Sequence, residues 1–297
     1  MKNVAVIAHS DKTFGGGLPE LREVLAQQGY SEPLWYEVDK SSKAPKRARK
    51  ALDAGAEIVF VWGGDGTVQM CIDALAGSTA VLAILPAGTA NLLAENLNIP
   101  IDISKAVHIG LHGNRRRLDT GTFNGEHFAV MAGTGFDAFV IKEAGNKLKE
   151  RLGRLAYFYT GTKNLSAQRV KALVEIDGKE FFRGKLSCVL IGNVSKGMGG
   201  VEVFENARPD DGYLDVAVVT AKNPLDWART FVRVTKGDPQ KSPFVQLSRG
   251  KEFQITFKKR FPFELDGGER KAVKKMHIKV QPASITICVP TDAAISS

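Results

Sequence analysis

Short apolar runs alternate with amphipathic stretches through the first third of the chain. The apolar runs predict β-strands, and the stretches whose apolar residues recur every three or four positions predict helices. This repeated strand–helix order predicts an α/β fold, a doubly wound parallel sheet with helices on both faces. The predicted strands are 3–8, 34–38, 58–62 and 81–85, and the predicted helices are 18–28, 44–54, 68–76 and a short helix that ends at Asn96.

The pattern changes after Arg117, where strand-like segments separated by Asp-Gly pairs become dominant. Asp-Gly between alternating apolar residues is typical of hairpin turns. We therefore predict a second domain that is mainly antiparallel β-structure. Its predicted strands are 128–132, 170–176, 185–191, 213–219, 253–257, 261–265, 277–280 and 285–289, and its predicted helices are 152–165 and 225–236.

The composition is that of an ordinary soluble globular protein, with 297 residues, 43% hydrophobic and 25% charged. The longest apolar stretch, 80–94, is interrupted by Pro86, Gly88 and Asn91, so no membrane span is expected. The first ten residues predict a strand rather than a signal peptide, which favours a cytoplasmic protein. Three widely separated cysteines predict buried thiols rather than a disulfide or a zinc site: Cys71, Cys188 and Cys288.

The net charge of +9 favours anionic partners such as ATP, a nucleic acid or an acidic lipid surface. Basic residues gather in four clusters, at 46–50, 115–117, 258–260 and 270–271. No aromatic residues interleave with them in the manner of a nucleic-acid-binding motif, so we expect no nucleic-acid partner.

The predicted strand 58–62 ends in Gly63, Gly64, Asp65, Gly66 and Thr67, directly before a helix. At such a position free backbone N–H groups and the helix dipole favour phosphate, and glycine lets the backbone approach it closely. A carboxylate there suits a Mg²⁺ ion carried by nucleotide phosphates. The lysine of a P-loop is missing, so backbone N–H groups and a threonine hydroxyl would hold the phosphate. The alternative is a tight turn with no ligand.

A second turn of this kind, 85–91, follows the strand 81–85 and contains Gly88, Thr89 and Asn91. Thr89 is the expected N-cap of the next helix, although capping alone does not account for the neighbouring proline, glycine and asparagine. Because ligands of parallel sheets bind at the carboxyl ends of the strands, we expect both turns to face one cleft.

Two acidic turns lie in the second half of the chain. The segment 208–215 contains clustered carboxylates that suit a hard cation, with a plain Asp-Gly turn as the alternative. The segment 263–270 predicts a hairpin tip, in which Asp266 is either catalytic or only a turn residue.

These four segments together resemble the diacylglycerol kinase catalytic-domain family, which includes bacterial lipid kinases and the sphingosine and ceramide kinases. The similarity covers nearly the whole chain. It rests on WGGDGT at 62–67, LPAGTAN at 85–91, RPDDGYLDV at 208–216 and ELDGGE at 264–269.

The resemblance implies an N-terminal α/β nucleotide-binding domain, a C-terminal β-sandwich domain for the lipid substrate, and ATP in the cleft between them. We place the domains at 1–118 and 119–284, with 285–297 returning to the first. The nucleotide contacts that we assign are Gly63, Gly64, Asp65, Gly66, Thr67, Gly88, Thr89 and Asn91. Beside Asp65, a Mg²⁺ site is implied at Asp211 with backbone oxygens near Arg208 and Tyr213.

The chain departs from the family pattern at three places. Gln69 and Met70 stand where many members have Asn and Glu, and Leu92 stands where an Asp is common. In the segment that resembles the DGE motif with the general base, Glu269 comes one position late. Whether Asp266 or Glu269 accepts the proton is left open, and we favour Asp266.

The resulting hypothesis is an ATP- and Mg²⁺-dependent lipid kinase of phospholipid metabolism that phosphorylates a lipid such as diacylglycerol and docks peripherally on anionic membranes. One alternative is an NAD kinase-like enzyme with a soluble acceptor, against which the LPAGTAN segment speaks. Another is a nucleotide-binding protein without activity. The sequence leaves the identity of the lipid and the oligomeric state, including a homodimer, open.

Overall fold

The computed structural model describes residues 2–134, 169–197, 202–235 and 237–291. Contacts divide the chain into two compact units. The N-terminal unit comprises 1–120, 126–129 and 281–297, and the β-rich unit comprises 121–125 and 130–280. The domain limits predicted from the sequence stay predictions.

A parallel sheet forms the centre of the N-terminal unit. Its strands are β1 (Val4–His9), β2 (Leu34–Val38), β3 (Ile58–Gly63) and β4 (Val81–Pro86), in the order β4-β3-β1-β2. Every residue of β1 and β3 is buried, as expected for strands that are covered on both faces. The last residues of the long strand β14 (Gly268–Val289) add a further parallel strand beside β4.

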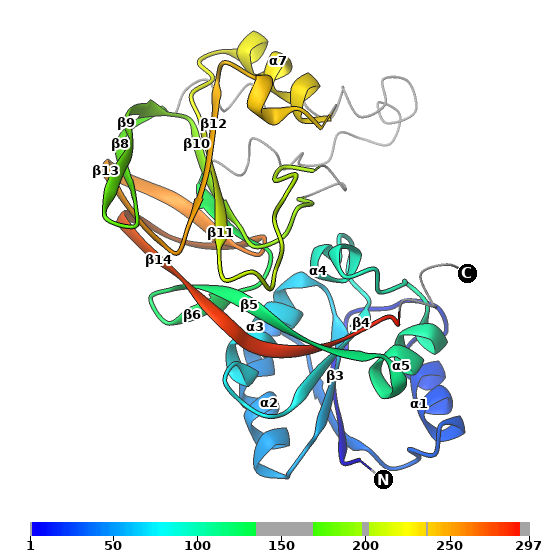
Figure 1. Ribbon diagram of the computed structural model, residues 1–297. Helices are drawn as coiled ribbons and strands as arrows, with labels where there is room; N and C mark the ends of the chain where they lie inside the picture. The colour runs from blue at the N-terminus through cyan, green and yellow to red at the C-terminus, as the bar shows by residue number, and fades with distance from the viewer. Residues whose placement is uncertain (1, 135–168, 198–201, 236, 292–297) are drawn as a thin grey trace. The chain divides into compact units, whose positions relative to one another are not determined.

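Helices cover both faces of this sheet, which confirms the predicted doubly wound fold (Figure 1). The pair α1 (Gly17–Gln27) and α5 (Ile103–His112) lies on one face, and the pair α2 (Ala44–Asp53) and α3 (Asp65–Leu75) lies on the other. A short 3-10 helix, η1 (Ser41–Lys43), follows β2, and α4 (Leu92–Asn96) follows β4.

Helix α5 was missing from the prediction, although its start carries a local signal. The carboxylate of Asp102 accepts the backbone N–H of Lys105 at 2.8 Å, which is a normal N-cap. Gly110 lets this helix pack closely on the sheet, since a Cβ atom there would lie 2.1 Å from the ring of Phe60.

The β-rich unit is mainly antiparallel, as predicted. Its strand order is β12-β11-β10-β7-β13-β14, with β8 and β9 beside β13, and α7 (Pro224–Thr235) and the 3-10 helix η4 (Pro239–Lys241) complete it. The strands are β7 (Met131–Thr134), β8 (Val170–Ile176), β9 (Lys179–Leu186), β10 (Cys188–Gly192), β11 (Leu214–Val219), β12 (Val245–Gly250) and β13 (Glu252–Leu265). Strand β5 (Asn114–Phe123) has residues in both units, and β6 (Glu126–Phe128) belongs to the N-terminal unit. The predicted helix 152–165 lies outside the described residues.

Two long strands replace pairs of predicted short ones. The segments 253–257 and 261–265 belong to the single strand β13, which is interrupted by a bulge between Thr256 and Phe261. The segments 277–280 and 285–289 belong to β14, although Ala283 within it has a φ of 48°. Pairing with β13 and β5 keeps the chain extended through residues that would favour a turn in isolation.

The three cysteines are free and buried, as predicted. Burial raises the pKa of Cys71 and Cys188 far above the ordinary thiol value and that of Cys288 to about 11. Within the described residues, no helix has the length and apolar character that crossing a membrane requires.

Candidate active-site residues

The two glycine turns of the N-terminal unit touch each other through their backbones. A Cβ atom placed on Gly88 would lie 2.4 Å from the Cα atom of Gly64, and one placed on Gly64 would lie 3.1 Å from the Cα atom of Gly88. Gly64 is the N-cap of α3, and Gly88 lies in the loop between β4 and α4. The turns therefore lie side by side beyond the carboxyl ends of β3 and β4.

The side chain of Asn91 holds the second turn closed. Its Oδ1 accepts the N–H of Gly88 at 2.8 Å, and its Nδ2 donates to the carbonyl of Gly88 at 2.9 Å. Asn91 has a left-handed backbone (φ 50°) and is the N-cap of α4. The prediction that Thr89 caps this helix was wrong, because the helix begins two residues later and Thr89 is exposed.

Asp65 links the two turns through its carboxylate. Oδ1 accepts the N–H of Leu92 at 2.6 Å, so a residue of α3 caps the start of α4. Burial raises the pKa of Asp65 above its ordinary value, and the backbone N–H groups around the carboxylate oppose this shift. Helix α3 begins at Asp65 rather than at the predicted residue 68. The carboxylate of Asp65 therefore has a structural role as the cap of α4, in addition to the metal-binding role predicted from the sequence.

Thr67 faces the interior of the N-terminal unit. It is 1% exposed, and its Oγ1 lies 2.9 Å from Oγ of Ser41. A Cβ atom on Gly63 would lie 2.6 Å from Cβ of Thr67, so the glycine makes room for this threonine. Gln69, one of the departures from the family pattern, is buried and donates to the carbonyl of His127 at 2.6 Å. The hydrogen bond to His127 gives Gln69 a structural role inside the N-terminal unit.

Backbone N–H groups at the two turns remain available for an anion. Within the described part of the chain, no hydrogen bond uses the N–H groups of Gly66, Thr89 or Ala90. Gly66 stands in the first turn of α3, where N–H groups have no acceptor within the helix. Together with the positive end of the helix dipole, these donors suit a phosphate group.

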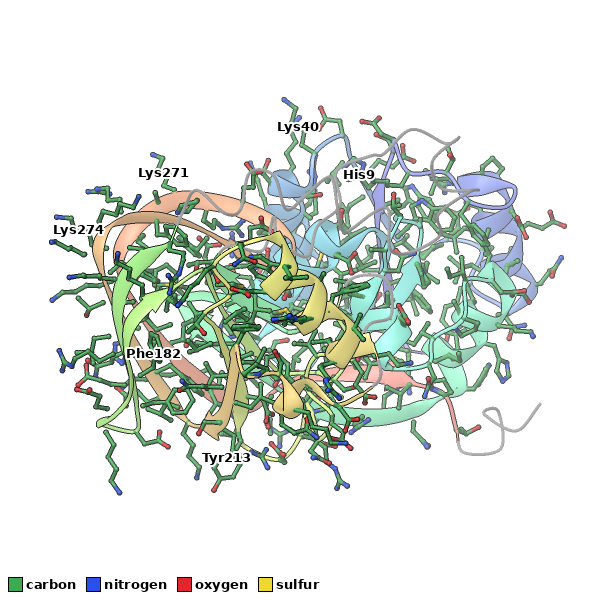
Figure 2. All side chains as sticks on the ribbon, turned by 90° about the horizontal axis from the view of Figure 1, so that it is seen from above. His9, Lys40, Phe182, Tyr213, Lys271 and Lys274 are labelled. Atoms are coloured by element: carbon green, nitrogen blue, oxygen red, sulfur yellow. The ribbon has the colours of Figure 1, made fainter. Side chains whose placement is uncertain are left out.

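His9 is a candidate that the sequence reasoning missed. It is the last residue of β1, is labelled in Figure 2, and is 8% exposed. Its Nδ1 is buried and has no hydrogen-bond partner among the described residues. Buried polar atoms of this kind are rare and often mark a ligand contact. The signal that could have found it is its position, since β1 ends at the same sheet edge as β3 and β4.

In the β-rich unit, Asp211 is engaged by protein groups on both carboxylate oxygens. Oδ1 accepts the N–H of Tyr213 at 3.0 Å, and Oδ2 pairs with the guanidinium of Arg249 at 2.5 Å. Arg249 also lies 4.7 Å from the centre of the Tyr213 ring. Asp215, whose pKa is raised by burial, stands on β11 opposite Arg249.

A Mg²⁺ ion at Asp211 would compete with the protein groups that already contact its carboxylate. A cation at Oδ2 would have to displace the Arg249 guanidinium, which already supplies the positive charge. The described residues hold no group of three or more His, Cys, Asp or Glu side chains arranged for a metal, whereas the predicted site uses one carboxylate and backbone oxygens. The ion pair of Asp211 with Arg249 stabilises this segment, and the Mg²⁺ site at Asp211 with backbone oxygens near Arg208 and Tyr213 stays a prediction.

Asp266 occupies the tip of the hairpin between β13 and β14. Asp266 and Gly267 both have positive φ angles, 45° and 78°, between the paired residues Leu265 and Gly268, which defines a two-residue type I′ turn. Asp266 is 4% exposed. Its buried position sets it apart from an ordinary hairpin tip, which is usually exposed.

Hydrogen bonds fasten this tip to β7. Oδ1 of Asp266 accepts the N–H groups of Val130 and Met131 at 2.9 and 2.8 Å, and its own N–H donates to the carbonyl of Met131 at 2.8 Å. Glu269, the alternative base, is exposed on β14 opposite Glu264. The two candidate bases thus differ sharply in environment.

The fold and these turns define a two-domain kinase architecture, and comparison with known families agrees. A family model described as "Diacylglycerol kinase catalytic domain" matches residues 6–123, and one described as "YegS C-terminal NAD kinase beta sandwich-like domain" matches residues 130–289. The chain belongs to the family of diacylglycerol kinases and YegS-like lipid kinases.

Relatives match the chain over most of its length. A diacylglycerol kinase of Staphylococcus carnosus is 28% identical, covering 84% of this chain and 82% of its own. A probable YegS-like lipid kinase of Cronobacter sakazakii is 29% identical over 92% and 91%, and one of Pseudomonas savastanoi is 30% identical over 87% and 84%.

Solved structures support the fold. A putative diacylglycerol kinase from Bacillus anthracis has a TM-score of 0.81 at 21% identity, covering 98% of each chain. An NAD kinase from Archaeoglobus fulgidus in complex with ATP has a TM-score of 0.51 at 12% identity, covering 97% of this chain and 93% of its own. The α/β and β-sandwich domain classes predicted from the sequence are confirmed.

Proposed function

We propose that this protein is an ATP-dependent lipid kinase that transfers the γ-phosphate to a hydroxyl group of a lipid such as diacylglycerol. The observation that carries the proposal is the contact between Gly64 and Gly88, which places two sets of backbone N–H donors beside each other. Family membership and the names of the relatives support lipid phosphorylation over other uses of such a site.

Backbone groups hold the triphosphate in this proposal. The N–H groups of Gly66, Thr89 and Ala90 donate to phosphate oxygens, and the dipole of α3 favours their negative charge. His9 supplies a further polar contact through its unpartnered Nδ1. Such fixed donors stabilise charge on a transferring phosphoryl group without reorganising during the reaction.

Asp65 arranges the two turns and is the residue that would hold Mg²⁺ bound to ATP. Its Oδ1 is used by Leu92, so a metal contact would come from the other oxygen. Bound to nucleotide phosphates, Mg²⁺ supplies positive charge that neutralises the phosphate oxygens and keeps several of its own water ligands.

Asp266 accepts the proton of the lipid hydroxyl in this proposal. The N–H groups of Val130 and Met131 fix one carboxylate oxygen, which orients the side chain. A general base must be oriented in this way toward the proton that it accepts. Loss of a general base typically lowers the rate about 10²–10⁴-fold. We further propose that the enzyme works as a peripheral protein at the surface of anionic membranes.

A transfer assay tests the proposed function. The protein is incubated with γ-labelled ATP, magnesium and, in parallel, dioctanoylglycerol, phosphatidylglycerol, a sphingoid base and NAD, and the products are separated and identified. The proposal predicts label in a lipid product and none in NADP. Label in NADP would favour an NAD kinase-like enzyme, and ATP binding without transfer to any acceptor would favour a protein without activity.

A further inference from the structure

Exposed cations gather where β13 and β14 bulge apart in the β-rich unit. Thr256 pairs with Lys275 and Phe261 pairs with Val273, so residues 257–260 of β13 stand opposite Lys274 alone. Bulges of this kind bend a strand and re-aim its side chains. The six exposed cations of this segment, here called the ribbon patch, are Lys258, Lys259, Arg260, Lys271, Lys274 and Lys275.

The cations of the ribbon patch are not held in ion pairs within the described residues, although Glu269 stands two residues before Lys271. None of these six side chains forms an ion pair with another described residue, and Arg260 donates a hydrogen bond to the carbonyl of Ala272 at 3.0 Å. Figure 2 shows the side chains of Lys271 and Lys274 pointing outward from the edge of the ribbon. Their charge is therefore directed at solvent rather than used inside the fold.

The neighbouring strands extend this positive charge. Phe257 pairs with Ala172 of β8. The residue before Ala172, Lys171, pairs directly with Lys185 of β9. Both lysines are exposed, and like charges placed directly opposite each other destabilise a sheet. The repulsion between Lys171 and Lys185 therefore lowers the stability of the β-rich unit. We take this as a sign that the positive charge serves to bind a partner outside the protein.

The acidic residues of the same strands lie outside the bulge: Glu175, Glu180 and Glu252 on one side of it, and Glu264 and Glu269 near the hairpin tip on the other. Glu252 pairs with Lys279, and Glu175 pairs with Gln254, several residues away from the bulge. Within the bulge itself, residues 257–260 and the facing Lys274 include four cations and no acidic residue.

We propose that the ribbon patch is the surface on which this protein docks to a bilayer rich in anionic lipid. Lysine heads on flexible stems suit headgroup charges that are spread over a plane. A nucleic acid is the weaker candidate, because the aromatic residues of the ribbon, Phe257 and Phe261, are both 2% exposed and offer no stacking surface. The inference rests on the proposed lipid kinase function, which requires access to a membrane-bound acceptor.

Vesicle co-sedimentation without ATP tests this surface independently of catalysis. The wild type, Lys271→Gln/Lys274→Gln and the control Lys46→Gln/Arg49→Gln are compared on phosphatidylcholine vesicles with and without phosphatidylglycerol. Both pairs are exposed and both variants lose two positive charges, but the control pair lies on α2 of the N-terminal unit. Thermal unfolding verifies that both variants are folded.

The ribbon variant is expected to lose about fivefold in affinity for anionic vesicles per lysine, about 25-fold in total, while the control stays near the wild type. Phosphorylation of dissolved dioctanoylglycerol stays unchanged in both. Equal losses in the two variants, wild-type binding by the ribbon variant, or tighter patch-dependent binding to DNA oligonucleotides would each overturn the proposal. A wild type that docks through the patch but phosphorylates no lipid would instead refute the proposed function alone.

Discussion

Gly88 and Gly64 approach so closely that a Cβ atom on Gly88 would lie 2.4 Å from the Cα atom of Gly64. Real side chains do not tolerate such a distance, and the obstacle is backbone rather than a flexible side chain. A Cβ on Gly88 would also lie 2.8 Å from Oδ1 of Asn91, the atom that closes the turn. The glycines are therefore required by space at the point where two strand ends meet.

Gly88→Ala should force the two turns apart, at a cost of about 1–3 kcal/mol in the free energy of unfolding, the usual range for overpacking. Gly66→Ala is the matched control, because a Cβ there would meet its nearest neighbour, Oγ of Ser41, at 3.8 Å. Alanine also favours the first turn of a helix more than glycine does. Urea unfolding of both variants checks this, and equal stabilities would show that the turns do not need their contact.

Asp65→Asn and Asp65→Ala separate the structural role of this carboxylate from its charge. The amide oxygen of asparagine can still accept the N–H of Leu92, whereas alanine loses this cap at a cost of about 0.5–2 kcal/mol. Since burial raises the pKa of Asp65, its ionised form is disfavoured in the folded protein, and asparagine should not lower stability near neutral pH. Phosphoryl transfer should fall in both variants. An asparagine variant with full activity would remove the charge of Asp65 from the mechanism.

Asp266→Asn should keep the hairpin and lose about 10²–10⁴-fold in the rate of transfer. Asparagine tolerates the positive φ of this position and retains the oxygen that accepts the N–H groups of Val130 and Met131. Glu269→Gln, at an exposed position on the same hairpin, is the control and should keep wild-type activity. The opposite result, a silent Asp266→Asn and a slow Glu269→Gln, would make Glu269 the base.

Acid should destabilise the protein in part through His127. Burial lowers the pKa of His127 while Asp73 opposes the shift, and the ring accepts or donates at Nδ1 to the hydroxyl of Thr120 at 2.8 Å. A histidine with a lowered pKa contributes stability that is present above its unfolded pKa of about 6.5 and is lost as pH falls through its folded pKa.

The free energy of unfolding should therefore decline less for His127→Gln than for the wild type between about pH 7 and about pH 5. His112→Gln changes an exposed histidine of α5 and should keep the wild-type slope. Parallel declines in all three proteins would exclude His127 as a source of the pH dependence.

Much of the fold was predictable because the strands of the N-terminal unit are continuous buried runs with glycine-marked ends. Strand β3 was predicted to within one residue. Strand β14 was not, because the local sequence around Pro282 and Ala283 favours a turn, and pairing with distant strands overrides it. The local sequence pattern does not reveal the stabilisation that comes from pairing with strands distant in the chain.

The candidate site was predictable in its position and not in its internal contacts. The expectation that the two glycine turns meet followed from the shared carboxyl edge of parallel strands. The cap that Asp65 places on Leu92, the bond between Thr67 and Ser41, and the ion pair of Asp211 with Arg249 join residues 26 to 38 positions apart. Such pairings depend on how loops settle against each other, which residue spacing alone does not specify.

The most direct test of the account is an NMR titration of the perdeuterated, ¹⁵N-labelled protein with a non-hydrolysable ATP analogue, with adenosine as the control that lacks phosphates. We expect the amide signals of Gly66, Thr89 and Ala90 to shift with the analogue and not with adenosine, because we propose that these N–H groups donate to phosphate oxygens. Saturable binding of the analogue that leaves all three amide signals in place would contradict it.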